Sequence, residues 1–221
     1  YGGYVPGSVP TKGQYFDVAR ELYPWKYLAI DELKKGHWPL WNPYNFSGTP
    51  LLANYQTAVF YPLNLLYFIL PFAAAWAILI VLQPLLGSLF LYLFATEIGI
   101  STWGAIIAAI ALNFGSFANV WIEFNTVWHT ILWLPLMLFL IERSVREKKA
   151  PWIRLSLFVF ALFSAITAGH PQDFLYTFIF LEIYSIARLL TDKTLTTKHR
   201  LTIALSFGGA TTLSFALAAP Q

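Results

Sequence analysis

Residues 73–96 read AAAWAILIVLQPLLGSLFLYLFAT, a run without a charged side chain. A helix needs about 20 consecutive apolar residues to cross the hydrocarbon core of a bilayer. The run meets that length, and its internal Pro84 and Gly87 are tolerated better in membrane helices than in soluble ones. This stretch therefore predicts a transmembrane helix, and with it an all-α polytopic membrane protein.

The composition of the whole chain also indicates a membrane protein. Of its 221 residues, 57% are hydrophobic and 11% charged, against about 25% charged in an ordinary soluble domain. A soluble protein of this size could not hide so much apolar surface. The absence of cysteine excludes disulfides and thiolate metal sites. Because Met137 is the single methionine, we expect the sequence to be a piece of a longer protein.

Further apolar runs alternate with short polar breaks through the rest of the chain. Each run is near the length of a spanning helix. We therefore predict a transmembrane bundle over residues 71–221 with about six spans, at 73–96, 103–120, 126–142, 152–169, 173–190 and 201–219.

The basic residues predict an orientation. After residue 70, every Lys and Arg falls in two short stretches, 143–154 and 188–200. The positive-inside rule places both stretches in the cytoplasm. The turns near 120–125 and 169–173 are then outside, together with residues 1–70. This distribution also explains the net charge of +3, so no nucleic-acid partner is expected.

Residues 1–70 are predicted to form an extracytoplasmic loop with interfacial helices. An amphipathic helix is expected at about 14–35, bent near Pro24, and a second interfacial stretch at about 55–70. The apolar stripe of the first helix is predicted to contain Leu22, Trp25, Leu28, Ala29 and Leu33.

Between these two segments lies a loop rich in Pro, Gly, aromatic and amide residues. Its aromatic rings could bind a sugar or a lipid headgroup, or could form the aromatic belt that Trp and Tyr make at membrane interfaces. A belt does not need the amides, which favours substrate binding. The candidate substrate-binding residues here are Trp41, Asn42, Tyr44, Asn54 and Gln56.

Several motifs resemble one bacterial family. The motifs Trp41-Asn42-Pro43-Tyr44, Gly48, Asn54-Tyr55-Gln56 and Phe60-Tyr61-Pro62-Leu63-Asn64 resemble the first extracytoplasmic loop of YfhO-type membrane proteins. Those proteins are similar to the GT-C superfamily of polytopic glycosyltransferases. Gly169-His170-Pro171-Gln172 with Tyr176, and Leu134-Pro135-Leu136 ending in Ile141-Glu142, also resemble that family. The resemblance covers essentially the whole chain.

The resemblance implies a GT-C architecture, of which this chain would lack the first spanning helix and the C-terminal remainder. Such enzymes take a sugar from a polyprenyl-phosphate carrier and transfer it to a cell-envelope glycan acceptor. They act on the outer face of the bacterial cytoplasmic membrane, among its lipids. Their catalytic carboxylate lies early in the first outer loop, and the matching position here is Asp17.

Asp17 could act as the base that accepts the acceptor's proton, or could help hold a divalent cation. Glu21, at i+4, could share its helix face. The stretch Asp17-Val18-Ala19 lacks the paired acids of some GT-C members, and Glu21 stands where the YfhO-type pattern has Gln, so metal dependence stays open. The alternative reading of Asp17 is a favourable charge at a helix N-terminus.

Two histidines and a glutamine complete the candidate substrate site. His129 lies within a predicted span, where an ionisable group suggests function, although a hydrogen-bonded packing histidine is an equal alternative. His170 and Gln172 lie at a hairpin tip, where Gly169 and Pro171 already favour a turn.

These observations predict an extracytoplasmic glycosyltransferase. The alternatives are a transporter or flippase of lipid-linked glycans, and a non-catalytic envelope assembly factor. We expect Glu97, Glu123, Glu142 and Glu182 to lie near the ends of spans, which argues against a transporter with an ion site at mid-membrane.

Overall fold

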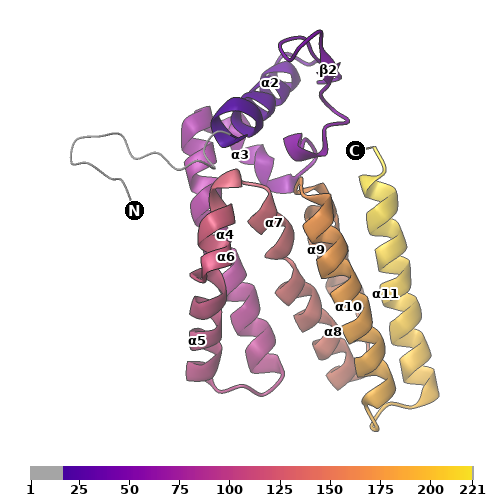
Figure 1. The fold of residues 1–221 in the computed structure, drawn as a ribbon. Coiled ribbons are helices and arrows are strands. Elements are labelled where there is room, and N and C mark those ends of the chain that lie inside the picture. Colours follow the sequence, from indigo (N-terminus) through magenta and orange to yellow (C-terminus); the bar gives the residue numbers. More distant parts are fainter. Residues whose placement is uncertain (1–16, 221) are drawn as a thin grey trace.

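The computed structural model describes residues 17–220 of the chain. The regular secondary structure of this part is helical apart from two strands of two residues each, as the sequence predicts. A bundle of long helices forms the body of the molecule, and a layer made by helix α2 and a small hairpin lies across one end of it (Figure 1).

Three helices are long and apolar enough to cross a membrane: α4 (Phe72–Glu97), α10 (Pro171–Thr191) and α11 (Thr197–Ala218). Helices α5 (Thr102–Asn113) and α6 (Ser116–Trp121), followed by η4 (Ile122–Phe124), together pass the same test but bend by 41° at their break. The predicted span 103–120 is therefore broken, at Phe114 and Gly115.

The predicted spans 126–142 and 152–169 also differ from single long helices. The first is divided into α7 (Val127–Ile131) and α8 (Leu134–Glu147). Pro135 is in the first turn of α8 and has no N–H to donate to the carbonyl of Ile131, so an unbroken helix would lose a hydrogen bond here. The second, α9, runs over Trp152–Thr167 and has 16 residues.

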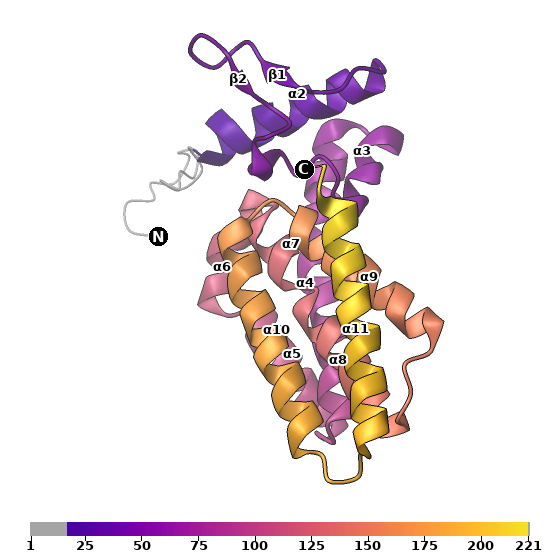
Figure 2. The ribbon, with the colours of Figure 1, turned by 90° about the vertical axis from the view of Figure 1, so that its right-hand side faces the viewer.

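Successive segments of the bundle run in alternating directions (Figure 2). Helix α4 packs against α5 and α8, and α9 packs against α11. The largest apolar core lies where α8 and α9 meet, and it includes Met137, Ile141, Phe158 and Leu162. The connections at 97–102 and 191–197 lie at the end opposite α2 (Figure 1), and the connection from α8 to α9 rises from that end along the side of the bundle (Figure 2).

The end opposite α2 holds the basic stretches, whose arginines form salt bridges with buried or half-buried carboxylates. The Glu97 carboxylate pairs with Arg143 at 3.1 Å and with Arg146 at 2.9 Å. The Glu142 carboxylate pairs with Arg188 at 2.7 Å. These pairs link α4 to α8 and α8 to α10.

The layer across the other end begins with a π-helical turn, η1 (Val18–Leu22), that continues into α2 (Tyr23–Lys34). Pro24 cannot donate to the carbonyl of Arg20, and the π-turn lies directly before it. The expected helix at 14–35 is thus present from residue 17, and residues 14–16 lie outside the described chain.

A short antiparallel hairpin follows α2, with β1 (Trp41–Asn42) paired to β2 (Thr49–Pro50). Gly48 has φ +103°, and a Cβ there would lie 2.4 Å from the Trp41 indole nitrogen. The chain then descends through η2 (Tyr55–Thr57), η3 (Pro62–Leu65) and α3 (Leu66–Ile69) to the start of α4.

Candidate functional site

The aromatic loop presents its rings to solvent above the bundle. Trp38, Trp41 and Tyr44 are 63%, 53% and 81% exposed. Flat, exposed rings of this kind suit a sugar ring or a headgroup. This surface is the part of the predicted substrate site that is open to a ligand.

The amides of this loop are largely committed to its own backbone. Asn42 is buried, and its Oδ1 accepts a hydrogen bond of 2.9 Å from the backbone N–H of Tyr44. Asn54 Oδ1 accepts one of 3.2 Å from the N–H of Gln56 and so caps η2. Asn42 and Asn54 therefore hold the loop in shape, while Gln56 is half-buried.

Asp17 and Glu21 are both exposed, one turn apart at the start of the α2 layer. Within residues 17–220, no group of three His, Asp or Glu side chains is arranged to hold a metal ion. The two carboxylates are thus accessible to a substrate or to solvent.

Beneath this layer lies a buried polar network centred on His129. The Tyr61 hydroxyl lies 2.8 Å from His129 Nδ1, and His129 Nε2 lies 3.0 Å from Asn125 Oδ1. An amide oxygen only accepts, so Nε2 carries the proton and Nδ1 accepts from Tyr61. Burial raises the pKa of Tyr61, which keeps the hydroxyl protonated as that donor.

Asn125 joins this network to α4. Its Nδ2 donates to the carbonyl of Trp76 at 3.2 Å, and its Oδ1 also accepts from Gln83 Nε2 at 3.3 Å. Gln83 donates in addition to the carbonyl of Ile122 at 2.9 Å. Asn125 itself adopts a left-handed conformation, φ +58°, at the end of η4. Asn125 therefore connects η4 to α4 and α7, and His129 extends the network to Tyr61 in the loop after η2.

Several buried polar atoms around this network have no hydrogen-bond partner within the described chain. They are Asn64 Oδ1, Tyr67 OH, Gln83 Oε1 and Thr126 Oγ1. Buried polar groups in native proteins are almost always satisfied by protein or water. These atoms leave capacity for water molecules or for polar groups of a ligand.

Lys26 is the most informative residue that the sequence did not single out. Residues 1–70 offer three candidate phosphate partners, Lys12, Arg20 and Lys26, and none of them stands out from the sequence. In the structure Lys26 is 1% exposed, whereas Arg20 is exposed, and Lys12 lies outside the described residues. Burial lowers the pKa of the Lys26 amine to about 7.

A sequence signal for Lys26 did exist. It follows Leu22 by four residues and precedes Ile30 by four, so it lies on the helix face that the structure buries with Ala29. Of the predicted stripe, Leu22 and Ala29 are buried, and Trp25, Leu28 and Leu33 are half-buried and pack against the apolar clusters beside α2.

The turn at Gly169 packs directly on this region. Gly169 has φ +105°, and a Cβ there would lie 3.1 Å from both Ala58 Cβ and Thr126 Cγ2. The Tyr55 hydroxyl donates to the carbonyl of Ile166. Three predicted segments, in the outer loop, at 125–129 and at 169–173, therefore meet at one end of the bundle.

The side chains of the turn are engaged locally. His170 Nδ1 lies 2.8 Å from Asp173 Oδ2 at the start of α10. Gln172 Nε2 donates to the Tyr176 hydroxyl at 2.9 Å. These contacts fit the turn reading of His170 and leave Gln172, which is exposed, at the rim of the region.

The prediction that Glu182 lies near the end of a span is wrong. Glu182 lies in the middle of α10 (Pro171–Thr191) and lines a cavity between α10 and α11. The predicted span 173–190 already has residue 182 near its midpoint, and in the structure eleven residues of helix precede it, about 16 Å at 1.5 Å per residue.

Neither a family model, nor a curated protein, nor a solved structure matches this chain.

Proposed function

We propose that this chain acts as an extracytoplasmic glycosyltransferase of the GT-C type. It would transfer a sugar from a polyprenyl-phosphate carrier to a cell-envelope acceptor. The observation that carries the proposal is the meeting of the aromatic loop, the His129 network and the Gly169 turn at the end of the bundle that the Asp17 layer covers.

The proposal includes six passes through the bacterial cytoplasmic membrane, with α5–α6 and α7–α8 each forming one broken span. The alternating directions of the helices support it, as does the gathering of the basic stretches at the end opposite α2. The α2 layer would then lie on the extracytoplasmic surface of the cytoplasmic membrane, among lipid headgroups.

Each part of the outer end has a role in this reaction. Asp17 would accept the proton of the acceptor hydroxyl. Exposed Trp41 and Tyr44 would hold sugar rings. Lys26, with the donors of the His129 network, would stabilise the charge that develops on the departing phosphate.

Cysteine labelling tests the orientation, and the chain has no cysteine that would give background. Two single-cysteine variants, Ser47→Cys and Lys193→Cys, are expressed separately and labelled in intact cells. A membrane-impermeant maleimide should label Ser47→Cys and should label Lys193→Cys only after the cells are lysed. Labelling of both, or of Lys193→Cys alone, would contradict the proposed orientation.

Replacement of Asp17 tests the catalytic role. In membranes that contain the protein, Asp17→Asn should lower consumption of lipid-linked sugar by at least about a hundredfold, because general-base catalysis is lost. Protein level and thermal midpoint should stay unchanged, since Asp17 is exposed.

The matched control is Asp31→Asn in the same layer, where the carboxylate pairs with Lys35 at 2.6 Å on the surface. This variant should retain wild-type turnover. Equal turnover in Asp17→Asn and Asp31→Asn would remove Asp17 from the mechanism.

A second candidate is a transporter or flippase of lipid-linked glycans. The mid-helix position of Glu182 favours it, because transporters place ionisable groups at membrane depth. A flippase would keep its translocation rate in Asp17→Asn and lose it in Glu182→Gln. An envelope assembly factor would show neither turnover nor translocation.

A further inference from the structure

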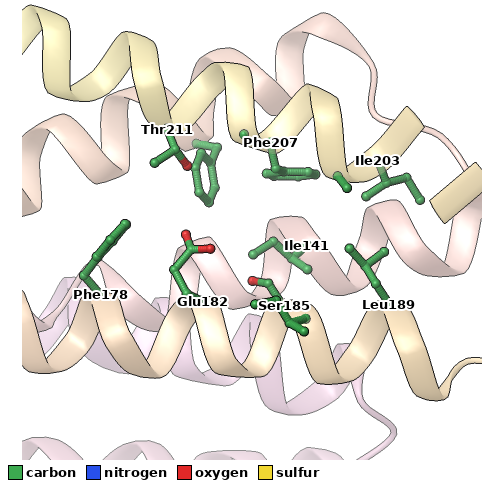
Figure 3. Close-up of a pocket in the computed structure, with 12 residues that line it drawn as sticks. Ile141, Phe178, Glu182, Ser185, Leu189, Ile203, Phe207 and Thr211 are labelled. Carbon is green, nitrogen blue, oxygen red and sulfur yellow. The ribbon is translucent and has the colours of Figure 1, made fainter. Parts of the chain in front are cut away.

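A cavity of about 390 Å³ lies between α10 and α11, away from the outer end of the bundle. Its volume is within the range of small-molecule sites, about 300–1,000 Å³. Phe178, Glu182 and Leu189 of α10 face Ile203, Phe207 and Thr211 of α11, and Ile141 of α8 lies behind them (Figure 3). Phe158 of α9 completes the lining.

Glu182 points into this space (Figure 3). Its carboxyl group forms no hydrogen bond or ion pair with any residue between 17 and 220. The other carboxylates of the bundle behave differently: Glu97 and Glu142 pair with arginines. An ionisable group at membrane depth is expensive and normally has a partner. The missing partner is therefore to be sought in the cavity.

The lining indicates what that partner is. Three phenylalanine rings, of Phe158, Phe178 and Phe207, share the cavity with the carboxyl group. Aromatic faces attract organic cations, and they do so more strongly where water is excluded. No Lys, Arg or His is among the lining residues of this cavity, so a carboxylate here has no cation from the protein. Most of the remaining wall is aliphatic, so the rest of the bound molecule should be apolar.

We propose that this cavity binds a lipophilic organic cation, with its ammonium group against Glu182 and its apolar substituents against the phenylalanine rings. This site is separate from the outer end of the bundle and does not depend on the transferase reaction. The ligand would enter between α10 and α11. Gly208 leaves this wall open, because a Cβ built there meets no atom within 4 Å.

The test compares two probes of the same shape. Benzyltrimethylammonium carries a permanent charge, and neopentylbenzene is its uncharged isostere. Binding to the purified protein in detergent is measured by equilibrium dialysis, with thermal midpoints recorded for each variant. The cation should bind saturably and at least about tenfold more tightly than the isostere.

Two variants test separate properties of the site, its charge and its volume. Glu182→Gln removes the charge and should weaken cation binding at least about tenfold while leaving the isostere unaffected. Gly208→Leu keeps the carboxylate but fills the open wall, and should weaken both probes. It replaces a helical glycine with a better helix former, so it should not unfold α11. Glu32→Gln, in the surface layer, is the matched control and should change neither probe.

Three results would overturn the proposal: no saturable binding of the cation, equal binding of cation and isostere, or equal cation affinity in the wild type and a folded Glu182→Gln. Should Glu182→Gln fail to fold, unchanged cation binding in Gly208→Leu would overturn it instead.

Discussion

Replacing Lys26 with methionine should raise the thermal midpoint of the protein, and the gain should be largest below pH 7. The Lys26 side chain is 1% exposed, and its burial lowers the pKa of the amine to about 7 from 10.5. Below pH 7 the folded protein must hold a charged amine in an apolar setting. Methionine fills a similar volume without that cost.

The pH dependence follows from proton binding. Between pH 7 and pH 10.5 the unfolded chain keeps a proton on Lys26 that the folded chain has released. The free energy of unfolding of the wild type therefore rises with pH across this window. The advantage of Lys26→Met should be on the order of 5 kcal/mol at pH 6 and should fall toward zero by pH 10.5.

Thermal unfolding in detergent at pH 6, 8 and 10 measures this effect, with Lys34→Met as the control because Lys34 is exposed on the same helix. A gain for Lys26→Met that does not change with pH would show that the amine is not titrating. Under the proposed function, the stabilised variant should also lose sugar transfer. That combination identifies a residue retained for function at the expense of stability.

Replacement of Asn125 should destabilise the protein strongly. Two contributions can be separated: the loss of its hydrogen bonds, and the cost of its left-handed backbone conformation for a residue with a Cβ. Asn125→Gly removes the hydrogen bonds to His129, Gln83 and the carbonyl of Trp76 and leaves all three groups buried. An unsatisfied buried polar group costs about 1–3 kcal/mol. Asn125→Ala should cost about 1 kcal/mol more, because φ +58° is unfavourable for a residue with a Cβ.

Thermal unfolding of both variants measures the two contributions. Asn119→Ala is the control, because Asn119 is exposed and donates only to backbone carbonyls of Phe114 and Gly115. Its effect should be below about 1 kcal/mol. Equal midpoints for Asn125→Gly and Asn125→Ala would show that the left-handed conformation is not maintained.

The helical fold was predictable because it depends on local properties of the sequence. An apolar run of the length of residues 73–96 forms a helix in lipid whatever surrounds it. The breaks within the predicted spans were harder to foresee. Pro135 and Gly115 are tolerated in many membrane helices, and whether the chain breaks there depends on what packs beside them.

The candidate site was predictable in part. The exposed rings of Trp41 and Tyr44 follow from a loop fixed by Pro and Gly. The amides of Asn42 and Asn54 were expected to face a substrate, yet they bond to their own loop, because short polar side chains readily satisfy nearby backbone groups. Polar residues inside apolar runs, such as Gln83, were a signal that the sequence offered and that was not used.

The sequence alone determined that this is a helical protein suited to a membrane, and which segments carry its aromatic and basic residues. Those properties depend on hydrophobicity summed along the chain. Only the tertiary structure decided that Lys26 is buried, that Tyr61 bonds to His129 across 68 positions, and that Glu182 faces a cavity. Each of these depends on contacts between helices distant in sequence, because burial and partner are set by what packs against a side chain.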